Sequence, residues 1–195
     1  MNLEIINQHF DEHLKVIKSI DNGQKEEILL IANVMVKSLA AGGTIFWCGN
    51  GGSASDSQHL AGELVGRFVG DRKPLRSLSL NADSAVMTCI INDFGYESLF
   101  SRQVEGLGSS GDVLVGITTS GNSQNVLKAL EAANKMSMTT IGFLGKGGGA
   151  AKNLAQHSII IESNSTARIQ EAHITVGHIL CDLIEEGLNL KPWVF

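Results

Sequence analysis

A histidine and a glutamate stand four residues apart soon after a glycine-rich turn. The stretch CGNGGSASDSQHLAGELVGRF spans residues 48–68 and places His59 one helical turn before Glu63. Residues at i and i+4 share a helix face, so this spacing brings an imidazole and a carboxylate together. Such a pair suits a divalent metal ion or proton transfer. The same pair is also common on helix surfaces, so it predicts no function by itself.

The turn before this pair, GNGGS at residues 49–53, suits an anion. Glycine permits positive φ and a close approach of the backbone, and a helix that begins at Ser53 would present free N–H groups. The segment also fits GxGxxA, a dinucleotide pattern, but that pattern needs an acidic residue after the next strand. Asp71 lies at about the right distance yet precedes that strand. A nicotinamide site is therefore the weaker hypothesis, and a tight turn that only packs helix on sheet is the plain alternative.

A second polar junction is TTSGNS at residues 118–123, which follows the most apolar predicted strand. An ordinary helix N-cap needs one small polar residue, whereas this segment holds five. Hydroxyl and backbone donors in such a loop can converge on one phosphate. Two junctions of this kind favour a phosphorylated small molecule as ligand. Neither carries the GKS/T ending of a P-loop, so hydrolysis of a nucleoside triphosphate is not expected.

The elements that must position these residues alternate along the chain. Short apolar strands between helices predict an α/β fold with a five-stranded parallel sheet, flanked by helices and doubly wound like flavodoxin. Ligands bind such sheets outside the carboxyl ends of the strands. The glycine-rich patch at 145–150 is expected to be a mobile loop. The predicted strands are 44–49, 76–80, 112–118, 139–145 and 157–163, and the predicted helices are 2–20, 24–41, 53–68, 83–91, 97–107, 123–136 and 168–188.

Length and composition predict one domain over residues 1–195, with an N-terminal helical segment at 1–41. Apolar residues make up 43% of the 195 residues, and the net charge of −5 argues against a nucleic acid as partner. Three widely spaced cysteines suggest a reducing cytoplasm, and we expect neither a signal peptide nor a membrane span. The helix at 24–41 is apolar on more than one side, which predicts burial in a core or against another subunit.

The long terminal helix carries three further polar residues, Gln170, His173 and His178. His173 falls on a different face from His178 and is expected to be packed rather than functional. Gln170 and His178 lie about 12 Å apart along a helix axis, so both reach one ion only if their side chains stretch toward each other, or if different chains donate them. Arg168 and Glu171 are interpreted as surface charges.

Four segments together resemble the phosphoheptose isomerases, which are sugar isomerase (SIS) domain enzymes. They are CGNGGSASDSQHLAGELVGRF, NDFGYESLFSRQVEGLG, GDVLVGITTSGNSQNVLKAL and RIQEAHITVGHI, in this order. The resemblance covers most of the chain and implies a single SIS domain that converts sedoheptulose 7-phosphate to D-glycero-D-manno-heptose 7-phosphate. It also implies a cytoplasmic homotetramer with active sites at subunit interfaces, zinc, and a product used in lipopolysaccharide or related polysaccharides.

The resemblance also implies roles for individual residues. It makes Glu63 and His178 the catalytic pair, with Glu63 as base and His178 as acid, although a glutamate that also ligates zinc would be a poorer base. The implied metal ligands are His59, Glu63, Gln170 and His178. The implied substrate-binding residues are Asn50, Gly51, Gly52, Ser53, Glu63, Asn92, Asp93, Thr118, Thr119, Ser120, Ser123 and Gln170.

One alternative of a different class stays open at this point. Some SIS-domain proteins are non-catalytic regulators that bind the replication initiator protein, and the TARIQE stretch resembles such a regulator about equally well. That regulator lacks a glutamate at the position of Glu63, so the presence of Glu63 favours the enzyme. Ala167 stands where some family members carry an acidic residue, which implies a difference in how the substrate is oriented.

Overall fold

A computed structural model describes residues 2–190. Its centre is a five-stranded sheet in the order β2-β1-β3-β4-β5, with all neighbouring strands parallel. This is the flavodoxin-like order, and the strand order reverses between β1 and β3. The predicted α/β class and the five-stranded parallel sheet are therefore confirmed. The strands are β1 (Ile45–Gly49), β2 (Ser77–Ser79), β3 (Val113–Thr118), β4 (Thr139–Gly145) and β5 (His157–Ile161).

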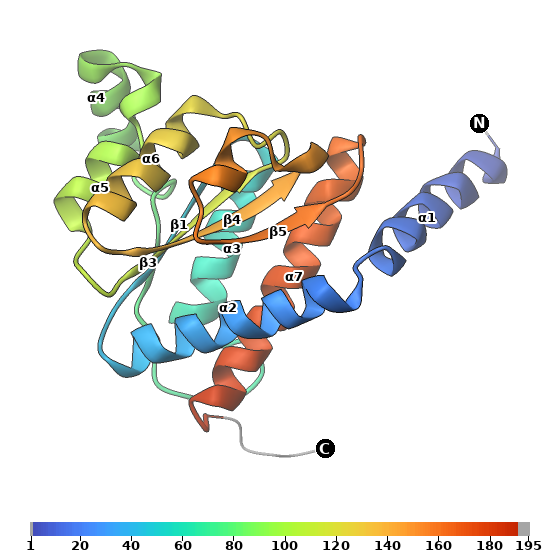
Figure 1. The fold of residues 1–195 in the computed structure, drawn as a ribbon, viewed down its shortest axis with the longest axis horizontal. Coiled ribbons are helices and arrows are strands. Elements are labelled where there is room, and N and C mark those ends of the chain that lie inside the picture. Colours follow the sequence, from blue (N-terminus) through green and yellow to red (C-terminus); the bar gives the residue numbers. More distant parts are fainter. Residues whose placement is uncertain (1, 191–195) are drawn as a thin grey trace.

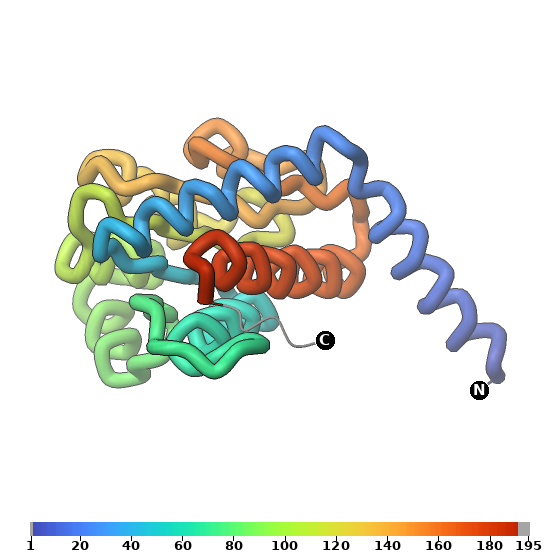
Figure 2. Tube along the Cα trace, turned by 90° about the horizontal axis from the view of Figure 1, so that it is seen from below, coloured from blue at the N-terminus to red at the C-terminus, as the bar shows by residue number. Residues whose placement is uncertain are grey.

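Helices cover both faces of the sheet (Figures 1 and 2). One layer holds α2, α3 and α7, which lie side by side, and the other holds α5 and α6 with α4 beyond them. α1 extends away from the body of the molecule. The helices are α1 (Leu3–Lys18), α2 (Asn22–Ala40), α3 (Gly52–Val65), α4 (Ser84–Phe94), α5 (Ser101–Leu107), α6 (Gln124–Lys135) and α7 (Thr166–Gly187), with 3₁₀ turns at Tyr96–Ser98, Lys146–Gly148 and Ala150–Asn153.

Alternate residues of the central strands pack into two separate apolar cores, one on each face of the sheet. Trp47 and Val115 pack toward α2, α3 and α7, whereas Phe46 and Leu114 pack toward α5 and α6. Strands buried on both faces read as continuous apolar runs, which is why TIFWCG and DVLVGIT are recognisable from sequence. The result is a rigid sheet whose carboxyl edge carries the loops of interest.

Several boundaries differ from expectation for local reasons. Asp21 accepts a hydrogen bond from the Gln24 backbone N–H, so α2 begins at Asn22, before the expected start at residue 24. The expected helix at 97–107 is a 3₁₀ turn followed by α5. The patch at 145–150 lies mostly in two 3₁₀ turns rather than in an irregular loop. Its Ala150 N–H donates to the side chain of Asn122, which ties it to the polar loop after β3.

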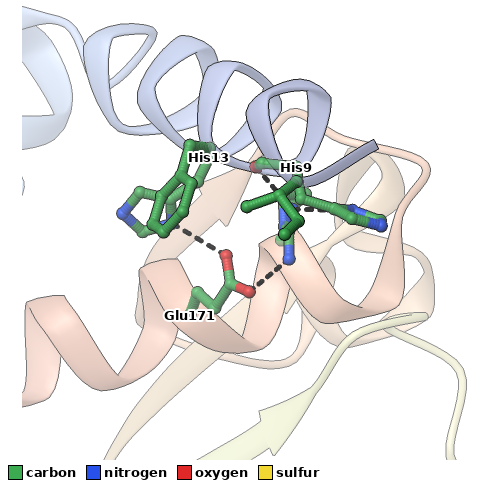
Figure 3. A pocket seen from close by; sticks show the side chains of 6 residues that line it. His9, His13 and Glu171 are labelled. Carbon is green, nitrogen blue, oxygen red and sulfur yellow. Dashed lines mark hydrogen bonds and ion pairs between the residues drawn. The ribbon is translucent and has the colours of Figure 1, made fainter. Parts of the chain in front are cut away.

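The N-terminal helix is attached to α7 by polar contacts (Figure 3). His13 Nδ1 lies 2.8 Å from Glu171 Oε2, and Arg168 donates to the His9 carbonyl at 2.7 Å. Arg168 and Glu171 also pair with each other, so their interpretation as mere surface charges was wrong. Ile6 and Phe10 complete the lining of a pocket of about 440 Å³ between α1 and α7.

None of the helices in residues 2–190 combines the length and the apolar character that a membrane span requires.

Candidate active site

Two loops meet at the carboxyl edge of the sheet, where the strand order reverses. β1 ends at Gly49 and pairs in parallel with β3, so the turn after β1 lies beside the loop that follows Thr118. Asn50 joins the two loops: its side chain exchanges hydrogen bonds with Asn125 of α6, at 2.9 Å in each direction. The structure therefore brings together the two segments that the sequence singled out as anion loops.

The glycine turn has the backbone geometry expected of a ligand-binding loop. Gly51 caps α3 with φ +58°, a conformation that favours glycine, and the Ser53 and Ala54 N–H groups donate to the Asn50 and Gly51 carbonyls. Gly52 lies against the Gln170 side chain, and a Cβ at this position would collide with that amide. Asn81 accepts from the Gly49 N–H and donates to the Gly49 carbonyl, which braces the turn from the end of β2.

Three hydroxyls, at the end of β3 and in the loop that follows it, form a compact cluster. The Thr118 hydroxyl oxygen lies 3.3 Å from that of Ser120 and 3.0 Å from that of Ser123. Ser123 is the N-cap residue of α6, yet its side chain makes no cap hydrogen bond to that helix. An ordinary N-cap role, the plain alternative for this segment, therefore does not account for Ser123. The cluster offers hydroxyl donors at a helix N-terminus, which is where a phosphate binds well.

Asn92 and Asp93 lie at the end of α4, on the exposed rim of this region. Their side chains bond each other at 2.7 Å, and neither side chain is hydrogen-bonded to the glycine turn. The nearby Tyr96, the single tyrosine of the chain, does make that connection: its hydroxyl donates to the Asn50 side chain at 2.6 Å. Sequence reasoning missed Tyr96, Asn125 and the brace from Asn81, because no pattern marks a residue whose role depends on a tertiary contact.

His59, Glu63 and His178 converge across two helices. His59 Nε2 lies 3.0 Å from Glu63 Oε1 within α3 and 2.9 Å from His178 Nε2 on α7. One ligand atom from each of the three residues falls within 4.8 Å of the others, which makes them a candidate metal group among the described residues. Two imidazoles and a carboxylate match the donors that zinc takes in catalytic sites. The predicted pair of α3 thus does meet the terminal helix.

The surroundings of this cluster are partly apolar. The Phe68 ring stacks on His178 with ring centroids 5.5 Å apart and planes inclined by 26°.

Burial changes the pKa of two groups in this region. Asp56 lies one turn before His59 on α3; burial raises the pKa of Asp56 to about 6, and the nearby His59 acts in the opposite direction. Burial also raises the pKa of the Cys48 thiol to about 12, so this cysteine beside the turn stays protonated and is no nucleophile.

The polar residues of the terminal helix lie in three different surroundings. The sequence predicted this separation only in part. His173 is buried, donates from Nε2 to the Leu144 carbonyl and packs against Phe143, which confirms that it is a packing residue. Gln170 lies over the glycine turn, nearer the N-terminus of α7 than His178. Within one chain the structure thus groups His178 with the α3 pair, and Gln170 with Gly52.

The similarity of the chain to known proteins agrees with this geometry. The sequence profile described as the SIS domain matches residues 8–145. The chain therefore belongs to the SIS domain family, and the fold is the one that family shares with its solved members.

Its relatives narrow the class further. The phosphoheptose isomerase of Nitratiruptor sp. is 47% identical over 185 residues, which cover 95% of this chain and 99% of that protein. The phosphoheptose isomerase of Helicobacter pylori is 47% identical over 187 residues, covering 96% and 97%. Within the SIS domain family the chain groups with the phosphoheptose isomerases, so it is a sugar phosphate isomerase.

Solved structures show the same relationship in three dimensions. A phosphoheptose isomerase from Neisseria gonorrhoeae superimposes with a TM-score of 0.89 at 38% identity, covering 94% of this chain and 98% of that one. A phosphoheptose isomerase from Francisella tularensis gives a TM-score of 0.91 at 35% identity, covering 95% and 100%.

Proposed function

We propose that the protein converts sedoheptulose 7-phosphate to D-glycero-D-manno-heptose 7-phosphate, and that this product feeds a heptose-containing surface polysaccharide. The observation that carries the proposal is the convergence of His59, Glu63 and His178 between α7 and α3, the helix whose first turn follows the glycine loop. The similarity to named phosphoheptose isomerases over nearly the whole chain supports it. The initiator-binding regulator is the weaker candidate, because nothing in a regulator requires Glu63 to be held beside two histidines.

The phosphate would bind at the carboxyl edge between β1 and β3. We assign it to the three-hydroxyl cluster, to Thr119 and to the N-terminus of α6, since charged oxygens are well satisfied by hydroxyl and backbone donors. The remaining proposed substrate contacts are Asn50, Gly51, Gly52, Ser53, Asn92, Asp93 and Gln170. The heptose chain would then extend toward α7.

The chemistry needs one base and one acid. Glu63 removes a proton from C1 of the ketose while His178 protonates the carbonyl oxygen at C2, which forms a 1,2-enediol. Loss of the proton from the C1 hydroxyl and return of a proton to C2 then give the aldose, so all atoms balance. Glu63 is about one quarter exposed, which leaves its carboxylate accessible from solvent.

The same residues fit a zinc ion. His59, Glu63 and His178 would hold it, and Gln170 would complete the set either by a shift along α7 or from another subunit. When bound, zinc would supply positive charge that stabilises a developing oxyanion. A Glu63 carboxylate bound to the ion would be a weaker base. We therefore expect the two roles of Glu63, as base and as zinc ligand, to compete.

We further propose that the protein is a cytoplasmic homotetramer. The exposed apolar side chains of α1, including Phe10 at 65% exposure, and those of Leu29 and Leu30 on α2 support burial against another copy. Among the cysteines, Cys48 and Cys181 are buried and all three are unpaired, as suits a reducing compartment.

The proposal is tested with purified protein and sedoheptulose 7-phosphate, with formation of the aldose followed by ¹H NMR. Sedoheptulose without its phosphate is the control substrate, and a parallel sample contains a chelator. We expect turnover of the phosphorylated sugar only. Binding of the initiator protein together with the absence of any turnover would establish the regulator instead.

A further inference from the structure

A buried ion pair lies next to the candidate site without belonging to it. Arg72, in the loop after α3, donates from Nε to Glu185 Oε1 of α7 at 2.6 Å, and their side chains are 1% and 0% exposed. Removing two charges from water is costly, and an apolar pair of similar volume is often as stable. A pair this completely buried therefore calls for a role other than stability alone.

The carboxylate of Glu185 holds a stretch of loop backbone. It accepts hydrogen bonds from three successive N–H groups: Phe68 at 3.1 Å, Val69 at 3.3 Å and Gly70 at 3.3 Å. Burial alone would raise the pKa of Glu185, but the hydrogen bonds from Arg72 and these N–H groups outweigh it and lower the pKa. Glu185 thus stays charged and fixes this loop against α7.

The guanidinium of Arg72 holds the end of α3. It donates to the Glu63 carbonyl at 2.8 Å and to the Leu64 carbonyl at 2.9 Å. The last carbonyls of a helix have no partner within that helix, so Arg72 satisfies two of them. One of the two belongs to Glu63 itself, whose side chain is the proposed base.

The two halves of the pair therefore reach the two catalytic candidates by separate routes. Glu185 lies two turns after His178 on the same face of α7. Its hydrogen bond to the Phe68 N–H places the phenyl ring that stacks on the His178 imidazole. Arg72 places the backbone of Glu63 on the facing helix.

We propose that Arg72 and Glu185 are positioning residues of the isomerase, and that they keep Glu63 and His178 in register through the α3 end and Phe68. This inference rests on the proposed function of that pair. A misplacement of about 1 Å by a change away from the reacting atoms can cost about 100-fold in rate. We expect Glu185→Gln, which keeps the size and removes the charge, to lower kcat by about 10–100-fold with little change in KM.

Asp112 provides a matched control. It is also a buried carboxylate that accepts loop N–H groups, from Thr44 at 2.7 Å and Ser109 at 2.8 Å, but these hydrogen bonds reach neither α3 nor α7. Asp112→Asn should lower the melting temperature in the same way as Glu185→Gln while kcat stays near the wild-type value.

A structural readout separates positioning from simple destabilisation. In metal-free protein, the ring current of Phe68 shifts the His178 Hε1 signal, which is assigned by its loss in His178→Gln. Phe68→Leu defines the signal of an unstacked imidazole. We expect Glu185→Gln to move the His178 signal toward that position and Asp112→Asn to leave it in place.

The outcomes are distinct. If Glu185→Gln melts earlier yet keeps the wild-type His178 signal and kcat, the pair is only structural and the proposal is overturned. If Glu185→Gln fails to fold, Phe68→Leu decides alone: an unchanged kcat would refute the route through the ring. If the wild-type protein has no isomerase activity, the proposed function fails, while the NMR comparison still decides whether the pair positions His178.

Discussion

His59 and His178 approach each other to 2.9 Å between their Nε2 atoms, although 119 residues separate them in the sequence. If both imidazole nitrogens carried a proton at this distance, the two N–H groups would repel each other. Either one nitrogen therefore donates to the other, or both bind a shared cation. Glu63, 3.0 Å from His59, supplies the negative charge that such a cation would need. This contact between α3 and α7 underlies the predictions on metal and catalysis.

The first prediction concerns metal content. Purified wild-type protein should bind about one zinc ion per chain. Loss of a residue that contacts only a metal ligand typically weakens metal binding by about 10–100-fold. His59→Ala removes a proposed ligand itself, so it should weaken zinc binding by more than that. Metal content after dialysis against graded chelator measures the affinity.

His157 supplies the control for that variant. It pairs with Glu27 at 3.0 Å at the start of β5, a histidine–carboxylate contact without a third ligand. His157→Ala should leave zinc binding unchanged. Equal zinc affinity in wild type and His59→Ala would remove the proposed metal site.

The hydroxyl cluster after β3 should act on binding more than on turnover. Phosphate contacts hold substrate and transition state alike, so Ser120→Ala combined with Ser123→Ala should raise KM more than it lowers kcat. Each lost hydrogen bond to a charged group is worth about 1.5–3 kcal/mol. Ser19→Ala removes a hydroxyl at the end of α1 and should change neither parameter. Steady-state kinetics check this, and an unchanged KM in the double variant would place the phosphate elsewhere.

His173 should make the protein sensitive to acid. Burial lowers the pKa of His173 from 6.5 to about 4, although its hydrogen bond to the Leu144 carbonyl acts in the opposite direction. The unfolded chain thus binds the proton first, so this contribution to stability is complete above about pH 6.5 and is lost as the pH falls toward 4. At pH 5 the loss is about 2 kcal/mol. Denaturant unfolding at pH 7 and pH 5 should show a smaller decrease for His173→Leu, whereas parallel decreases would refute the assignment.

The apolar face of α1 should be an assembly surface. Phe10→Glu places a charge on a side chain that is 65% exposed in the single chain, so it should reduce the mass measured by light scattering from about four chains to a smaller assembly. Leu107, 54% exposed at the end of α5, is the control, and Leu107→Glu should keep the wild-type mass. A monomeric wild-type protein with full activity would contradict the proposed interface sites.

The sequence predicts the sheet well because its strands are buried on both faces. TIFWCG and DVLVGIT are buried on both faces, so each gives a continuous apolar run that is recognised as a strand. The carboxyl ends of these strands locate both anion loops. Helix ends are less well predicted, since the start of α2 depends on a cap at Asp21 rather than on periodicity.

Contacts across the fold are the part that sequence patterns miss. Nothing local marks Asn125 as the partner of Asn50, or Glu185 as the anchor of Phe68, because each role exists only after α6 and α7 have packed. His59 and Glu63 were predicted from spacing, and their meeting with His178 was implied by family resemblance. The three-residue geometry then came from the structure.

The role of Glu63 as base is the central claim, and Glu63→Gln tests it most directly. The substitution keeps the size and removes the charge of a side chain that is about one quarter exposed, so the melting temperature should hardly change. His178→Gln should behave similarly, and the two losses should combine less than multiplicatively, since both groups act on one enediol. The measurement is kcat for sedoheptulose 7-phosphate, followed by ¹H NMR of the aldose. We predict that kcat of folded Glu63→Gln falls by about 10²–10⁴-fold, the range typical of a lost general base. Near-wild-type kcat in the folded variant would contradict the mechanism.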